Sequence, residues 1–145
     1  MRPLRPLSPG ARRILCAARD VIRPRGHGFD HAIDDDVLAG VEAFLPFLPQ
    51  PMRLAFPLGL RLLEWGPPLV LGRMTRFSRL APAEARRYLD RALALGGPLG
   101  AMVLGVRTLV LLCFYQHPDV LQTLEVDWAG RARERTAHRA ALMAE

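Results

Sequence analysis

The chain has 145 residues and half of them are apolar, which suits one domain with its own hydrophobic core. This apolar content excludes disorder over most of the length. The net charge is +6 at pH 7, and all 20 basic residues are Arg. Residues 1–25 hold seven Arg against one acid, and residues 73–95 hold six Arg against two acids. The basic start and the basic middle are separated by an acidic stretch.

This uneven charge suits docking to an acidic protein, an anionic lipid or a nucleic acid, and it equally suits solvated helix faces. A nucleic-acid partner is not expected, because no predicted helix combines clustered Arg with Asn or Gln that could read bases. Cys16 and Cys113 lie in apolar stretches without metal or redox spacing, so both are expected to be small buried hydrophobes.

Residues 1–7 contain two prolines and predict a flexible arm. A first helix is predicted to begin after Ser8, which can cap its N-terminus. Pro9 suits the first helical position, where no backbone N–H is needed. Pro24 and Gly26 predict its end.

Two interpretations are open for the polar segment 23–36. If the segment were helical, four of its side chains would recur at a spacing that could bind a metal ion. These are His27, Asp30, His31 and Asp34. Two glycines disfavour a helix there, and an apolar-periodic run follows directly. We therefore prefer residues 34–36 as N-cap and first-turn acids of a helix over about 35–45, and we expect no metal.

A third helix is predicted over about 52–64, after a break at Pro46, Pro49 and Pro51. Pro57 should kink this helix or delay its start. The whole segment 44–71 is rich in Leu, Phe and Pro and has few charges. It suits a membrane surface or a partner's apolar patch, and ordinary core packing is the alternative.

Pro82 and Glu84 predict the next helix, because Pro suits the first helical position and an acid suits the first turn. The sequence Gly-Gly-Pro at 96–98 predicts a sharp turn into an antiparallel neighbour. Residues 98–115 are apolar around the entire helical wheel, which predicts an element covered on all sides. Their single charge, Arg107, is expected to be buried against a carboxylate or several carbonyls, with Asp90 and Asp119 as candidates.

The length of 98–115 approaches that of a membrane span, but its charge and its glycines favour the buried helix of a globular domain. Pro118 predicts a short helix after it, and residues 129–145 predict a polar C-terminal helix. The expected fold is all-α, a compact bundle of about five to seven helices around 98–115, with a single domain over 8–128.

The usual catalytic motifs are missing: there is no phosphate-binding glycine loop, HExxH, GxSxG or cysteine cluster. The two serines, Ser8 and Ser78, form no triad with the histidines at any readable spacing. We therefore expect neither enzyme activity nor a cofactor bound to this chain.

The order of six segments along the chain supports a family resemblance. These segments are RDVIRPRG, DDDVLAGVEAFL, LGLRLLEW, FSRLAPAEARRYLDRAL, CFYQHP and DVLQTLEVDW. Over about residues 10–128 the chain resembles the gluconate 2-dehydrogenase subunit 3 family. It also resembles the small helical domain ahead of some glucose–methanol–choline (GMC) oxidoreductases and long-chain alcohol oxidases. The resemblance is strongest at Phe77, Leu80, Pro82, Arg86, Leu89, Phe114, Tyr115, Pro118, Val120 and Leu124. The chain departs from the family at residues 125–128, where a glycine–tyrosine ending is usual, and it lacks a twin-arginine signal.

The resemblance implies a non-catalytic accessory subunit that binds and stabilises a large FAD-dependent oxidoreductase of the GMC type. The FAD is then expected in the partner. The alternative is a peripheral membrane protein that uses the apolar, Pro-rich segment as an anchor. Without a signal peptide of its own, the chain is expected in the cytoplasm or at the periphery of the inner membrane. The residues expected to contact the partner are Phe47, Phe56, Trp65, Tyr115, His117 and Trp128, and those expected to have structural roles are Arg107, Pro82 and Pro118.

Overall fold

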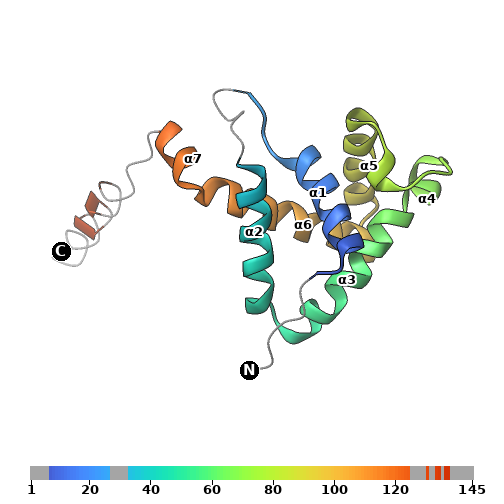
Figure 1. Ribbon diagram of the computed structural model, residues 1–145, viewed down its shortest axis with the longest axis horizontal. Coiled ribbons are helices and arrows are strands. Elements are labelled where there is room, and N and C mark those ends of the chain that lie inside the picture. Colours follow the sequence, from blue (N-terminus) through green and yellow to red (C-terminus); the bar gives the residue numbers. More distant parts are fainter. Residues whose placement is uncertain (1–6, 27–32, 125–129, 131–132, 135, 138–145) are drawn as a thin grey trace, which may run out of the picture.

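The computed structural model describes residues 7–26, 33–124, 130, 133–134 and 136–137, and every regular element among these residues is helical. Figure 1 shows the helices crossing one another around α6. The predicted all-α bundle of five to seven α-helices is confirmed. In chain order the elements are α1 (Pro9–Ile22), α2 (Asp34–Phe44), the 3₁₀ turn η1 (Leu45–Phe47), α3 (Gln50–Trp65), α4 (Pro67–Leu71), the 3₁₀ turn η2 (Phe77–Arg79), α5 (Pro82–Leu95), α6 (Gly97–Gln116) and α7 (Pro118–Thr123).

Proline marks the start of several helices, as the sequence predicts. Pro9, Pro82 and Pro118 each stand in the first turn of α1, α5 and α7. The Ser8 hydroxyl accepts a hydrogen bond from the backbone N–H of Ala11 at 3.2 Å, which caps α1. Pro82 and Pro118 were expected to have structural roles, and both stand at the start of a helix.

The centre of the bundle is α6, which contacts α1, α2, α3, α5 and α7. Its inner face carries Val103, Val106, Val110 and Phe114, and each is at most 2% exposed. Burying one such side chain contributes about 1.5–3 kcal/mol relative to leaving it in water. One continuous core therefore holds all the longer helices to α6.

The outer face of α6 differs from the prediction. The helix is continuous, as expected, but the expectation that it is covered on all sides is wrong. Within α6, only 33% of an apolar stretch of 18 residues is buried inside the bundle, and Leu104 remains 54% exposed. Within the described part of the chain, α6 is the one helix long and apolar enough to cross a membrane. The sequence shows that the outer face of α6 is apolar, but it does not show whether other helices of the same chain pack over that face.

Arg107 also differs from the prediction. It is exposed, and among the described residues it forms no ion pair with Asp90, Asp119 or any other acid. The expected burial with a partner is therefore wrong, because the bundle leaves this side of α6 open to solvent. A solvated guanidinium needs no partner in the fold.

The connection between α5 and α6 is tight. Gly96 and Gly97 adopt positive φ angles of 71° and 61°, which glycine adopts at no steric cost. Gly100 then lies against Ala92 and Leu93 of α5, so that an added Cβ would stand 3.0 Å from the Ala92 carbonyl oxygen. Farther along α6, residues 103 and 107 share a hollow with residues 86–90 of α5. This order is that of two antiparallel neighbours, as predicted.

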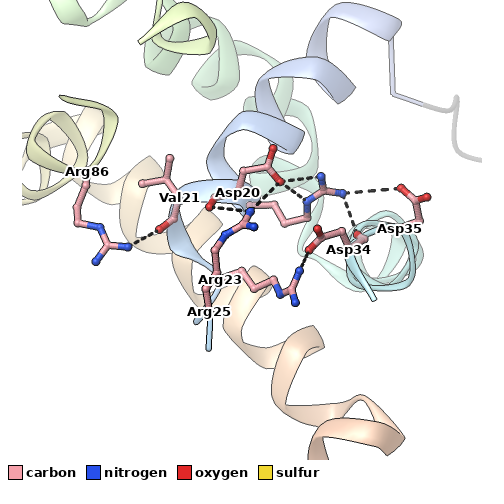
Figure 2. A network of polar contacts seen from close by, with 8 residues as sticks. Asp20, Val21, Arg23, Arg25, Asp34, Asp35 and Arg86 are labelled. Carbon is pink, nitrogen blue, oxygen red and sulfur yellow. Dashed lines mark hydrogen bonds and ion pairs between the residues drawn. The ribbon is translucent and has the colours of Figure 1, made fainter. Parts of the chain in front are cut away.

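A network of polar contacts holds the end of α1 to the start of α2 (Figure 2). The Arg19 guanidinium donates to the Asp34 carbonyl oxygen at 2.9 Å and pairs with Asp20 at 2.7 Å. Arg23 is 3% exposed, pairs with the Asp34 carboxylate and lies over the Phe114 ring at 5.9 Å. The aspartates at 34–36 form the first turn of α2, as predicted, and Asp34 also takes part in this clasp. The expected N-cap among them is wrong, because Ile33 stands at the N-cap position and no described side chain caps the helix there.

α3 begins at Gln50 and continues through Pro57 to Trp65. The expected delay of its start at Pro57 is therefore wrong. Pro51 stands in the first turn, where its missing N–H costs nothing, and this position supports the earlier start. Pro57 lies inside the helix and cannot donate the backbone hydrogen bond that other residues at this position would form.

Glu64 and Tyr88 join α3 to the elements beside it. Glu64 is 7% exposed, and its carboxylate accepts from the Ser78 backbone N–H at 3.0 Å and from the Ser78 hydroxyl at 2.7 Å. The Tyr88 hydroxyl donates to the Leu63 carbonyl oxygen at 2.9 Å. Burial, together with the charge of Glu64, raises the pKa of Tyr88 above its usual value of 10.0. These contacts fix the inner side of α3.

The predicted terminal segments fall largely outside the described residues. Residues 1–6 of the expected arm lie outside them, whereas Leu7 is partly buried against the core. Of the expected C-terminal helix 129–145, the described positions 130, 133–134 and 136–137 are helical. Trp128 lies outside the described residues.

Candidate functional site

A groove of about 830 Å³ runs between α6 on one side and, on the other, the end of α2, Leu48 just after η1, and α3. Its walls on α6 extend from Pro98 to Leu112, about 21 Å of helix at 1.5 Å per residue. The groove is therefore long enough for about four helical turns. The residues that line it are Phe44, Leu48, Met52, Ala55, Phe56, Leu58, Gly59, Leu62, Pro98, Ala101, Met102, Leu104, Gly105, Thr108, Leu109 and Leu112.

Among the described residues, none that lines the groove carries a charge. Thr108 is its one polar side chain, and its hydroxyl donates to the Leu104 carbonyl oxygen in its own helix at 2.8 Å. That bond satisfies the hydroxyl donor within α6. The groove can therefore receive apolar surface, but it offers almost nothing that would orient a polar substrate.

The sequence builds the α3 wall with two apolar faces. Phe56, Leu60 and Leu63 point into the core, and none is more than 7% exposed. Leu54, Leu58 and Leu62 follow a second helical period and remain 68%, 65% and 39% exposed. A helix that only covers a core needs one apolar face, so the second face of α3 is available for another contact.

The α6 wall is made partly of small residues. Ala101 and Gly105 stand one turn apart on the exposed face, and a Cβ added at Gly105 would meet no atom within 4 Å. Across the groove, Gly59 of α3 is already occupied, because a Cβ there would stand 2.4 Å from the Met102 sulfur. The bundle therefore uses the small size of Gly59 but leaves the space beside Gly105 open.

The structure places one of the predicted contact residues, Phe56, in the groove lining and a second, Phe47, beside it. Phe56 is 7% exposed and forms part of its floor. Phe47 is 78% exposed and packs on Phe44, with ring centroids 6.3 Å apart, at the η1 end of the groove. The contact that we expect for these two aromatics stays a prediction.

The other predicted contact residues lie outside the groove lining. Trp65 is 57% exposed at the end of α3, and the Arg76 guanidinium lies over its ring at 4.4 Å from the centroid. Tyr115 is 47% exposed and lies three residues after Leu112, so it continues the same face of α6. His117 caps α7 by accepting from the Asp119 N–H at 3.3 Å. Trp128 cannot be placed relative to the groove.

Most of the groove could not be predicted from the sequence, because its walls come from segments about 50 residues apart. One signal was present. In α3 the positions 54, 58 and 62 repeat with helical spacing outside the core period of 56, 60 and 63. In α6 the small residues at 101 and 105 are also one turn apart. Both patterns indicate a helix face that its own core does not use.

The described residues contain no group of three or more His, Cys, Asp or Glu side chains that could hold a metal ion. Of the four residues weighed for a metal, His27, Asp30 and His31 lie outside the described residues, and Asp34 pairs with Arg23. The Cys113 thiol is half-buried beside Gly40, and burial raises its pKa, which makes it a poorer nucleophile at neutral pH.

Comparison with protein-family models found no match for the chain, and neither the curated proteins nor the solved structures gave a match. The resemblance to the gluconate 2-dehydrogenase subunit 3 family therefore stays a prediction from the sequence.

Proposed function

We propose that the chain is a non-catalytic accessory subunit that binds and stabilises a large FAD-dependent oxidoreductase of the GMC type. The observation that carries this proposal is the open groove between α3 and α6, an apolar surface that the described chain leaves uncovered. Contiguous exposed apolar surface of this kind marks an interaction site in a soluble protein. The family resemblance supplies the class of partner, and the flavin belongs to that partner.

The groove favours an α-helix of the partner as the occupant. Its lining offers almost no group that could bond to a backbone N–H or C=O, so an extended segment would bury unsatisfied backbone polar groups. A helix satisfies its own backbone and needs only an apolar face. Gly105 and Ala101 allow its axis to come close to α6, as in helix-in-groove recognition.

Complex formation is tested by expressing the full chain together with a GMC-type oxidoreductase from the same organism, followed by size-exclusion chromatography. The expected result is co-elution of the two proteins with flavin absorption in the shared peak. Gly105→Leu should abolish co-elution, because a Cβ at this position meets no atom of the free chain and the rest of the leucine side chain would extend into the groove. Ala39→Leu, on an exposed position of α2 outside the groove, is the matched control and should leave co-elution unchanged.

The partner hypothesis is wrong if the two proteins elute separately and the oxidoreductase is equally soluble and active without this chain. Co-elution that Gly105→Leu does not affect would retain the partner but exclude the groove as its docking site.

A second candidate function is peripheral membrane binding, which one stripe of α3 favours. Leu54, Leu58 and Trp65 are all more than half exposed and share a face with Arg61, whose long side chain can reach anionic headgroups. Flotation with vesicles that contain anionic phospholipid distinguishes the two functions. Flotation of the chain alone, lost in Leu58→Glu, supports the membrane function, and failure to float removes it.

A further inference from the structure

A second hollow, of about 180 Å³, lies between the end of α1, α5 and the middle of α6. Four aliphatic side chains line it, namely Val21, Ile22, Leu89 and Val103. Three charged side chains surround them, namely Arg86, Asp90 and Arg107. The hollow thus combines an apolar surface with guanidinium groups from two different helices.

This hollow is separate from the docking groove. Successive residues of an α-helix are rotated by about 100°, so Arg107 points about 200° away from Gly105 on α6. The groove and the hollow share no lining residue. A ligand in the hollow would therefore leave the proposed docking surface free, and the inference that follows is independent of the proposed function.

The two guanidinium groups at the hollow keep most of their donors available. Arg86 stands one helical turn before Asp90, a spacing at which the two often pair, yet its guanidinium donates to the Val21 carbonyl oxygen at 3.3 Å (Figure 2). That bond uses one of its five N–H donors. Arg107 forms no hydrogen bond or ion pair with the described residues. Neither guanidinium forms an ion pair with a described residue.

The surface beside the hollow adds more positive charge. Arg87 and Arg91 line a shallow depression on α5 that shares Arg86 and Asp90 with the hollow. Four Arg against one Asp give this region a local charge of +3. Like charges one helical turn apart, as at positions 87 and 91, cost about 0.2–0.5 kcal/mol in a helix. A bound anion would relieve this repulsion.

We propose that this hollow binds a small organic anion, whose carboxylate or phosphate group bonds to Arg86 and Arg107 while a short apolar portion lies on the aliphatic side chains. Guanidinium groups match the planar, bidentate geometry of carboxylate and phosphate oxygens. The volume corresponds to about six water molecules at about 30 Å³ each, which suits an anionic group with a short alkyl chain. Val21 and Ile22 are partly exposed and provide contact for that chain.

Binding is tested by titrating the full chain with butyl phosphate and with butanoate, followed by NMR of backbone amides and by calorimetry. Potassium chloride at the same ionic strength is the reference for screening alone. The expected result is saturable binding, with shifts at Val21, Leu89 and Val103. Butyl phosphate should bind about tenfold more tightly than inorganic phosphate, because part of its alkyl chain is buried.

Three single substitutions locate the site. Arg107→Gln and Arg86→Gln should each weaken binding at least about tenfold, because each removes charge-assisted hydrogen bonds to the anion. Arg61→Gln, an exposed α3 position with the same change in charge, should change the dissociation constant by less than twofold. Arg107 is exposed and its guanidinium forms no hydrogen bond or ion pair with the described residues, so its variant should remain folded and report on binding.

Three outcomes would overturn the inference. Equal binding in Arg107→Gln and in Arg61→Gln would mean that only net charge matters. Shifts that chloride reproduces would mean that the guanidiniums are simply solvated. Binding to anionic vesicles without binding to the soluble anions would assign the cluster to a membrane surface.

Discussion

Replacing Gly105 by Ala should stabilise the isolated chain. Gly105 lies in the interior of α6, and an added Cβ would meet no atom within 4 Å. Ala is favoured over Gly inside a helix by about 0.5–1 kcal/mol, because Gly loses more backbone freedom on folding. We therefore expect the free energy of unfolding to rise by about that amount, which corresponds to an increase in Tm of about 1–4 °C for a chain of this size.

The same substitution at Gly100, in the same helix, should have the opposite sign. A Cβ there would stand 3.0 Å from the Ala92 carbonyl oxygen and 3.4 Å from that of Leu93. Both are backbone atoms of α5, so the two helices would have to move apart. Overpacking of this kind costs about 1–3 kcal/mol, which exceeds the gain in helix propensity. The expected net effect is a loss of about 1–2 kcal/mol.

Urea unfolding followed by circular dichroism measures both variants against the wild type, with equal m-values as the check that the denatured state is unchanged. A destabilised Gly105→Ala variant would refute the reasoning. It would mean that the folded chain packs something against this face of α6, so the groove would not be open to a partner.

Further predictions concern the polar contacts. Asp34→Asn should lower the free energy of unfolding by about 1–3 kcal/mol, because it weakens the pairing with the buried Arg23, whereas Asp35→Asn, at a side chain that is 97% exposed, should cost less than about 0.5 kcal/mol. Glu64→Gln should cost about 1–3 kcal/mol through the bonds from Ser78, and urea unfolding measures all three variants. The raised pKa of Tyr88 means that the folded chain keeps this proton when the unfolded chain loses it, so stability should fall as the pH rises above about 10. Tyr88→Phe should cost about 1 kcal/mol at pH 8 and should flatten that alkaline decline in a series of thermal melts. An equally steep decline in this variant would assign the pH effect to another group.

Helix starts and the fold class were predictable because their causes are local. Ser8 with Pro9, and Pro82 and Pro118, fix helix starts within one turn of chain, and the glycines at 96–97 fix the turn between α5 and α6. The acids at 34–36 likewise predict the first turn of α2. Such signals need no knowledge of the distant parts of the chain.

The cover over α6 was not predictable, because it depends on which helices the chain can bring there. An apolar wheel looks the same whether its outer face meets the same chain, another protein or lipid. The prediction that Arg107 is buried was wrong for the same reason. It rested on the assumption that α6 is covered by other helices on all sides. The second apolar period of α3 was readable, but its distance from α6 in sequence hid the groove that the two helices form.

The clasp between α1 and α2 has a practical consequence for handling this protein. Arg19 and Arg23 hold Asp34 directly, so the intervening residues connect two points that are already fixed to each other. Closing a longer connection between fixed ends costs only about 0.6 kcal/mol for each doubling of its length. The groove includes Phe44 of α2. This residue stands at the opposite end of α2 from Asp34, about 15 Å away along the helix axis. A fluorescent or affinity label inserted between residues 26 and 33 should therefore leave the docking surface intact, so that binding can be measured with the labelled chain.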